Sequence, residues 1–443
     1  MSIFIVSKRS DSLSGIITVP GDKSISHRAL IFGALSSGTT KIHGLLVSQD
    51  VTNTANALTS LGVPSEIINN TWHINGVGTG GFIQPTTATL DFGNSGTGVR
   101  LMLGALAGHD ITVTCVGDKS LSRRPLQRVT APLKQMGLTV DSSCNTLPVT
   151  VTGTTELLPI EYTLPVPSAQ VKSAILIAGL QARGTTCVIE NEATRDHTER
   201  MLRYFGAKIE TKCKNGRTSI SVDGYTELTG REVWIPGDPS SAAFLIAAAT
   251  IVPGSDLTLN NILYNPTRTG FYQSLLEMGA DITLKNKREL GGEPVVDIRV
   301  RSSKLKGIIV PPERAPSMID EYPILAVTAA FAAGTTVMQG LDELKVKESN
   351  RLSATAAGLV ANGVDANIYD ATLTVIGTQS VLGGGLVTTN LDHRIAMAFS
   401  ILGLGALNAV TIDDGSVLAT SFPDFCSVVR SIGGNIETVW SSS

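Results

Sequence analysis

The sequence predicts an α/β protein of two domains, each built from three similar modules of helices and strands. Three observations lead to this prediction. The chain has 443 residues, a length typical of two or three domains, and 42% of these residues are apolar, which is enough for more than one hydrophobic core. One kind of apolar helix recurs six times, at intervals of about 70–80 residues. The turn Pro20-Gly21-Asp22 in front of the first module returns, after three modules, as Pro236-Gly237-Asp238.

The first helix of each module is strongly apolar and follows a short stretch of small and polar residues. These helices are expected to begin near Ser26 (SHRALIFGAL), Thr97 (TGVRLMLGALAG), Ala169 (AQVKSAILIAGL), Ser240 (SSAAFLIAAAT), Asp320 (DEYPILAVTAAFAAG) and Asp392 (DHRIAMAFSILGLGA). Helices that are apolar on all sides are buried, so we expect them at the centres of the two domains.

A second, amphipathic helix follows in each module and stops at a glycine. The glycines are Gly62, Gly137, Gly206, Gly279, Gly363 and Gly433. A glycine just past a helix end takes the left-handed conformation that terminates the helix. Short alternating stretches from Ile111, Leu138, Cys187 and Leu373 are typical of strands between the helices.

An even division of the modules sets the expected domain boundaries. One domain is expected to comprise residues 1–20 plus 237–443, and the other residues 21–236, with crossovers near 20 and 236. The N-terminal strand, within residues 2–19, is left over from the module count. We expect it to complete a sheet of the domain that holds the C-terminal half.

Composition narrows the class of protein. With a net charge of −3 and a pI near 6.1, no overall basic field attracts nucleic acid. The five cysteines are odd in number, far apart and without CxxC spacing, and the six histidines lack metal-ligand spacing. No apolar run is long enough to span a membrane, and the first residues lack a signal-peptide core. We therefore expect a cytoplasmic protein, a monomer, with no metal, no cofactor and no nucleic-acid or membrane partner.

The polar segments in front of the apolar helices are the candidate binding sites. In PGDKSISHRAL, Asp22 or Ser24 can cap a helix, while Lys23 and Arg28 add positive charge to its N-terminus. One such stretch alone is as well explained by an ordinary capped surface helix; the repetition favours anion binding. If six helix N-termini converge on an interdomain cleft, that cleft attracts a small, multiply charged anion. Acid and base candidates in the same segments are Asp320, Glu321 and Glu348.

Nine motifs in register carry a resemblance to a known family. They are PGDKSISHRAL, DFGNSGTGVRL, GDKSLSRRP, PSAQVKSAILIAGL, TRDHTERML, PGDPSSAAF, IDEYPILA, ELKVKESNRL and LDHRIAMAF. Together, from about residue 15 to 430, they resemble the 5-enolpyruvylshikimate-3-phosphate synthase family of enolpyruvyl transferases. The resemblance implies two domains of three βαβαββ units each, joined by two crossovers. It also implies transfer of the enolpyruvyl group of phosphoenolpyruvate to the 5-hydroxyl of shikimate 3-phosphate, with release of phosphate, in the shikimate pathway to chorismate and the aromatic amino acids.

The resemblance also assigns residues. Shikimate 3-phosphate is expected at Lys23, Ser24, Arg28, Ser168, Gln170, Arg195, Asp320 and Lys347. Phosphoenolpyruvate is expected at Lys23, Asn94, Gly96, Arg124, Gln170, Arg351 and Arg394. The catalytic residues implied are Asp320 as base on the 5-hydroxyl, assisted by Lys347, Glu348 as proton donor to the methylene carbon, and Lys23 in proton transfer. The inhibitor glyphosate occupies the phosphoenolpyruvate site in this family, and Gly96 favours sensitivity to it.

Plainer interpretations stay open for several residues. Arg28, Arg100 and Lys172 could simply solvate helix starts, and Asp22 and Asp238 are expected as turn and cap residues. Packing or hydrogen bonding is expected for His27, His197 and His393. GVGTGG at Gly76 mimics a dinucleotide loop but is followed by FIQP, so we interpret it as a turn.

The sequence departs from the family pattern at three positions. Thr420 stands where many members have lysine, Asn350 where aspartate is common, and Leu101 where proline is common. The sister enzyme acting on UDP-N-acetylglucosamine carries a cysteine in the loop that here reads GDKSLSRRP. A non-catalytic anion-binding repeat protein and an RNA-end-processing cyclase are further alternatives. The acidic balance of the chain argues against the cyclase.

Overall fold

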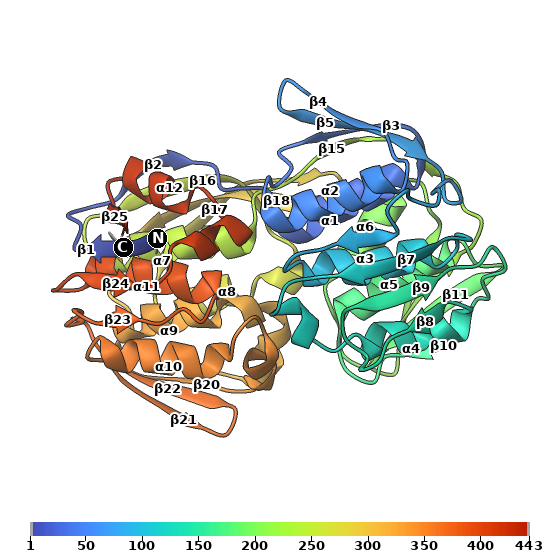
Figure 1. The fold of residues 1–443 in the computed structure, drawn as a ribbon. Helices are drawn as coiled ribbons and strands as arrows, with labels where there is room; N and C mark the ends of the chain where they lie inside the picture. Colours follow the sequence, from blue (N-terminus) through green and yellow to red (C-terminus); the bar gives the residue numbers. More distant parts are fainter. Residues whose placement is uncertain (1–2, 441–443) are drawn as a thin grey trace. The chain divides into compact units, whose positions relative to one another are not determined.

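The chain divides into two compact units in the computed structural model, which describes residues 3–440 (Figure 1). The first unit contains the described residues up to Pro20, Gly237–Arg288 and the chain from Pro294 onward. The second contains Gly21–Pro236 and the short segment Glu289–Glu293. This segment is the tip of a β-hairpin and lies outside the boundaries expected from the sequence.

Each unit contains three sheets, and all six sheets of the described chain repeat one strand order. The first strand runs parallel to the second, and the third and fourth are antiparallel additions. In the second unit the orders are β15-β3-β5-β4, with β14 also on β3, then β6-β7-β9-β8 and β10-β11-β13-β12. Their bounds are β3 Ser36–His43, β4 Ser65–Ile68, β5 Thr71–Val77, β6 Thr89–Asp91, β7 Thr112–Val116, β8 Thr139–Asp141, β9 Val149–Thr152, β10 Glu161–Thr163, β11 Thr185–Glu190, β12 Ile209–Lys214, β13 Arg217–Asp223, β14 Leu228–Thr229 and β15 Glu232–Trp234.

In the first unit the orders are β2-β16-β18-β17, β19-β20-β22-β21 and β23-β24-β1-β25. The bounds are β1 Ile3–Lys8, β2 Ser14–Ile17, β16 Asp256–Leu263, β17 Asp281–Leu290, β18 Glu293–Arg301, β19 Ile309–Val310, β20 Ala333–Met338, β21 Asp365–Tyr369, β22 Thr372–Thr378, β23 Leu386–Val387, β24 Val410–Ile412 and β25 Asn435–Trp440.

The segments next to the crossovers add strands to sheets of the modules in each unit. The N-terminal segment forms two strands: β1 pairs with β24 and β25 of the last module, and β2 pairs in parallel with β16 of the fourth. In the second unit, β15 pairs in parallel with β3 of the first module. The parallel edge strand that modules one and four lack in their own sequence is therefore supplied just before the chain changes unit.

The apolar helices form the cores. They are α1 Lys23–Ala34, α3 Gly96–Leu106 and α5 Ala169–Gly179 in the second unit, and α7 Pro239–Ile251, α9 Tyr322–Ala330 and α11 His393–Gly405 in the first. In the first unit α7, α9 and α11 pack against one another (Figure 1). Every residue of α7 is buried. In the second unit α3 lies against both α1 and α5. Helix α9 begins two residues after the expected Asp320, because Ile319–Glu321 forms a separate 3-10 turn, η4.

The amphipathic helices end as the sequence predicted. They are α2 Gln49–Ser60, α4 Gln127–Met136, α6 His197–Tyr204, α8 Gly270–Glu277, α10 Arg351–Ala361 and α12 Phe425–Ser431. The six expected glycines all have positive φ, from 78° at Gly363 to 120° at Gly137. No helix in the described part of the chain is long and apolar enough to cross a bilayer.

Candidate active site

The start of α1 places Lys23 against a buried carboxylate. Asp22 caps the helix, its Oδ1 accepting a hydrogen bond from the backbone N–H of Ile25 at 2.8 Å. The next residue, Lys23, forms an ion pair through Nζ with Oδ2 of Asp50 in the first turn of α2. The Asp50 side chain is 3% exposed and that of Lys23 is 19% exposed. The carboxylate therefore fixes the end of a lysine side chain that stays partly exposed.

Arg28 is buried rather than solvated. Its Nε donates to Thr198 Oγ1 at 2.7 Å, its Nη2 to Ser173 Oγ at 2.7 Å and its Nη1 to the Ser24 carbonyl at 2.9 Å. Burial lowers the pKa of Arg28 to about 10, against the opposing effect of nearby carboxylates such as Glu199. The interpretation of Arg28 as a solvated helix start is wrong: the guanidinium joins α1 to α5 and α6.

Four residues expected at phosphoenolpyruvate come together around the start of α3. Arg124 Nη2 donates to Asn94 Oδ1 at 2.8 Å, and Gln170 Nε2 donates to Thr97 Oγ1 at 2.9 Å. A Cβ on Gly96 would lie 3.1 Å from Arg124 Nη1. The Nε of Arg124 is buried and has no hydrogen-bond partner among the described residues. A guanidinium donor in this state, beside a helix N-terminus, is suited to an anionic ligand.

Ser168 and Arg195 flank the same unit's third module. Ser168 caps α5, its Oγ accepting from the Val171 N–H at 3.4 Å. Arg195 lies in the loop between β11 and α6, close enough for its charge to contribute to the lowered pKa of Arg28. Arg195 of the third module therefore lies near Arg28 of the first.

In the first unit the expected residues converge on Arg351, whose side chain is 1% exposed. Its Nη1 donates to Asp320 Oδ1 at 3.1 Å, its Nη2 to Glu348 Oε2 and its Nε to Asp392 Oδ2 at 2.8 Å. Burial acts to lower the pKa of Arg351, but Asp392, Glu348 and Asp320 together raise it above its ordinary value. The guanidinium therefore stays charged and holds the two candidate acid-base carboxylates on adjacent nitrogens.

Two further cations adjoin this group. Lys347 Nζ is 3.7 Å from Asp320 Oδ1. Arg394 Nη1 is 3.4 Å from the Asp320 carbonyl oxygen and 3.8 Å from Glu321 Oε1. The residues expected in this unit are therefore linked to one another through Asp320 and Arg351.

Sequence reasoning missed the supporting carboxylates. Asp50 lies in the first turn of an amphipathic helix, whereas the candidate sites were expected at the starts of the apolar helices. Asp392 lay within the DHR motif but was not assigned; it caps α11 through the Arg394 N–H at 2.9 Å as well as holding Arg351.

The possibility that Lys172 solvates a helix start is wrong, because its side chain is 1% exposed and bonded to Glu190 and Glu199.

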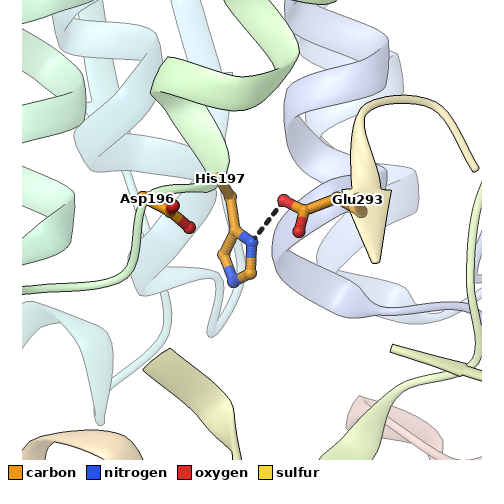
Figure 2. A group of neighbouring side chains, drawn as sticks. All are labelled: Asp196, His197 and Glu293. Atoms are coloured by element: carbon orange, nitrogen blue, oxygen red, sulfur yellow. Dashed lines mark hydrogen bonds and ion pairs between the residues drawn. The ribbon is translucent and has the colours of Figure 1, made fainter. Parts of the chain in front are cut away.

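Among the described residues, one group has metal-ligand geometry: Asp196, His197 and Glu293, whose ligand atoms lie within 4.8 Å of one another. Figure 2 shows the His197 ring between the two carboxylates. Its Nδ1 lies 2.7 Å from Glu293 Oε1. Arg200 Nε already lies 2.7 Å from Asp196 Oδ2 and 3.9 Å from Glu293 Oε2. The Arg200 guanidinium already supplies the positive charge beside these two carboxylates, so the group does not suit a divalent metal.

The first histidine has the packing environment expected for it. His27 Nδ1 lies 2.9 Å from Thr54 Oγ1 in the interior of the second unit. Burial, then Lys23, then Arg28 hold the pKa of His27 well below its usual range. The other ring nitrogen, Nε2, lies 3.5 Å from Ser95 Oγ, so this neutral ring fills space and forms hydrogen bonds through both nitrogens.

Comparison with known proteins gives one consistent result. The model of the family described as EPSP synthase (3-phosphoshikimate 1-carboxyvinyltransferase) matches residues 7–429. A 3-phosphoshikimate 1-carboxyvinyltransferase of Parvibaculum lavamentivorans is 55% identical over 435 residues, covering 97% of this chain and 96% of that protein. One from Pseudomonas sp. (strain PG2982) is 52% identical over 434 residues, with the same two coverages. A solved EPSP synthase structure from Acinetobacter baumannii superposes with a TM-score of 0.89 at 42% identity, covering 99% of this chain and 100% of that one.

Proposed function

This chain belongs to the EPSP synthase family, and we propose that it is a 3-phosphoshikimate 1-carboxyvinyltransferase whose reaction is carried out by the residues gathered in each of its two units. The enzyme transfers the enolpyruvyl group of phosphoenolpyruvate to the 5-hydroxyl of shikimate 3-phosphate and releases phosphate. The sister reaction on UDP-N-acetylglucosamine is not favoured.

The proposed chemistry separates an acid from a base. Glu348 donates a proton to the methylene carbon of phosphoenolpyruvate, and Asp320 accepts the proton of the 5-hydroxyl as its oxygen bonds to the adjacent carbon. Phosphate then leaves and one methyl proton returns to Glu348, which restores the double bond. Lys23 and Lys347 neutralise charge and assist proton movement at the reacting atoms.

The remaining residues bind the two anions. Shikimate 3-phosphate is held, in this proposal, by Lys23, Ser24, Arg28, Ser168, Gln170, Arg195, Asp320 and Lys347. Phosphoenolpyruvate is held by Lys23, Asn94, Gly96, Arg124, Gln170, Arg351 and Arg394. Guanidinium groups suit the bidentate binding of phosphate and carboxylate. No cofactor enters this scheme.

One observation carries the assignment of the acid and the base: Asp320 and Glu348 bind the Nη1 and Nη2 of one buried guanidinium, that of Arg351. A single charged group thereby sets the spacing of the two carboxylates. Both carboxylates are partly buried and paired with this guanidinium, unlike carboxylates on the protein surface that are solvated by water.

The assignment is tested by Asp320→Asn and Glu348→Gln, which keep the size of each side chain and remove its acid-base function. We expect each to lower kcat by about 10²–10⁴-fold while shikimate 3-phosphate still binds. Asp342→Asn is a matched control, because Asp342 is 73% exposed and bonded to Lys345 in the same segment. Near-normal turnover in either active-site variant would remove its role.

We also propose that the two units act as domains with crossovers near residues 20 and 236, and that the enzyme is a cytoplasmic monomer. The compact units support the first point. All five cysteines are free thiols, which fits a reducing compartment. Analytical ultracentrifugation tests the oligomeric state, and a sedimentation mass of twice 46.5 kDa would contradict it.

A further inference from the structure

Lys172 is a buried cation that the proposed mechanism does not use. It lies on α5, and its Nζ is 3.1 Å from Glu190 Oε2 and 2.7 Å from Glu199 Oε1. The three side chains are between 1% and 5% exposed. Burying a lysine and two carboxylates costs free energy even when they are paired. The presence of this charged cluster in the core therefore suggests a role other than stabilising the fold.

The two carboxylates stand on either side of one loop. Glu190 is the last residue of β11, and Glu199 lies in the first turn of α6. Between them runs the segment 191–196, which contains Arg195. The Lys172 ammonium therefore links β11 and α6, the two elements that this loop connects. Thr194, within the loop, donates a further hydrogen bond to Glu190 Oε1.

Apolar packing gives this loop little support. Asn191, Glu192 and Ala193 are exposed. Asn191 and Glu192, with Glu190, line a small cavity beside the proline-rich segment that precedes Ser168. Without core contacts along its first half, the loop depends on polar anchors at its ends.

The same network continues to Arg28. Ser173, next to Lys172, lies 2.6 Å from Thr198, next to Glu199, through their hydroxyl oxygens. Arg28 donates to both hydroxyls. The α5–α6 contact thus holds Arg28 directly and carries the loop of Arg195.

We propose that Lys172, with Glu190 and Glu199, is a positioning group that sets the loop carrying Arg195 for recognition of shikimate 3-phosphate. The inference rests on the proposed role of Arg195 in binding that substrate. Lys172 touches neither substrate in this account. It acts by keeping β11, the loop and α6 in one arrangement, so its loss affects one substrate more than the other.

Burial raises the pKa of Glu199, while the charge of Lys172 opposes that shift. Removing Lys172 alone therefore leaves two carboxylates without their common cation. The Lys172→Met, Glu199→Gln double variant removes one carboxylate charge together with the ammonium. It keeps the volume of the core and separates loss of positioning from unfolding.

The experiment compares steady-state kinetics of Lys172→Met, the double variant, Lys172→Arg and Glu190→Gln with those of the native enzyme. We expect KM for shikimate 3-phosphate to rise about tenfold or more in the double variant, with KM for phosphoenolpyruvate changed less than about twofold. Lys172→Arg restores a cation and should recover part of the loss. Glu190→Gln keeps a hydrogen-bonding group and should give a smaller change of the same kind. Arg203→Met is the matched control at the other end of α6, where Arg203 bonds Ile209 and Thr211, and it should leave both KM values unchanged.

Arg195→Ala provides the reference. If Arg195→Ala raises KM for shikimate 3-phosphate but the double variant and Glu190→Gln do not, the positioning role is wrong and the role of Arg195 stands. An equal rise in both KM values in the double variant overturns it as well. If Arg195→Ala has no effect, both the role of Arg195 and the inference that rests on it fail.

Discussion

Arg351 and Asp392 form an ion pair in the interior of the first unit, with Arg351 Nε 2.8 Å from Asp392 Oδ2 and both side chains at most 1% exposed. The same carboxylate accepts a hydrogen bond from Ser349 Oγ at 3.1 Å and caps α11. Asp392 therefore fixes the guanidinium whose other two nitrogens hold Asp320 and Glu348.

The Asp392→Asn variant tests this relationship. The amide keeps an acceptor for the helix cap but removes the charge paired with Arg351, and breaking a buried pair costs about 3–5 kcal/mol when no relaxation occurs. We expect a lower unfolding temperature and a fall of about tenfold or more in kcat/KM for phosphoenolpyruvate. Ser349→Ala, which removes one hydrogen bond to the same carboxylate, is the control and should cost far less. Equal kinetics for Asp392→Asn and the native enzyme would show that Arg351 does not need this partner.

Lys23 depends on Asp50 in a comparable way in the second unit. Asp50→Asn removes the charged acceptor of Lys23 Nζ without changing the shape of the side chain. Because the ammonium then loses its fixed position, we expect kcat to fall by about 10–100-fold. Gln49→Ala, an exposed change in the same helix turn, should leave kcat unaltered. A kcat that is unchanged in Asp50→Asn would separate the ion pair from catalysis.

Gly96→Ala tests the phosphoenolpyruvate assignment around α3. A Cβ at this position would lie 2.7 Å from Arg100 Nη1 and 3.1 Å from Arg124 Nη1, so the guanidinium groups must shift. We expect a higher KM for phosphoenolpyruvate, weaker inhibition by glyphosate and an unchanged KM for shikimate 3-phosphate. Gly80→Ala, where a Cβ meets nothing within 4 Å, is the control. Unaltered phosphoenolpyruvate kinetics in Gly96→Ala would count against the placement of this substrate.

His109 predicts a pH dependence of stability. Burial lowers its pKa from 6.5 to about 4, and its Nδ1 donates to the Ala105 carbonyl at 2.9 Å while Nε2 has no partner among the described residues. As pH falls from about 6.5 to about 4, the unfolded state binds the proton first, so His109 lowers the free energy of unfolding, by at most about 3 kcal/mol.

Chemical denaturation of His109→Gln at several pH values measures this contribution. The loss of stability between pH 6.5 and 4 should be smaller in the variant than in the native protein. His73→Gln, in the partly exposed strand β5, serves as the control. Parallel pH profiles for the native protein and His109→Gln would contradict the expectation.

Features that depend on neighbouring residues could be predicted from the sequence. The left-handed glycine after each amphipathic helix is one, since the conformation at Gly62 or Gly137 depends on the local chain. The caps by Asp22 and Asp238 are another. The three-module repeat follows from the recurrence of apolar helices, which need no knowledge of their partners.

Features that depend on distant partners could not. Nothing in residues 3–17 distinguishes a strand that pairs with β24 from one that pairs with β16, and the segment forms both. Lys172 and Arg28 look like solvated helix-start cations until Glu190, Glu199 and Thr198 are brought beside them by the fold. Asp50 and Asp392, the carboxylates that position the cations, could not be predicted either, because their partners Lys23 and Arg351 lie far from them in the sequence.

The measurement that tests the central claim most directly is phosphate release from phosphoenolpyruvate by the native enzyme. Three parallel reactions contain shikimate 3-phosphate, UDP-N-acetylglucosamine or neither acceptor. The account predicts release only with shikimate 3-phosphate, and its loss in Asp320→Asn and Glu348→Gln but not in Asp342→Asn. Release with the sugar nucleotide alone, or equal release in the active-site variants and the native enzyme, would contradict it.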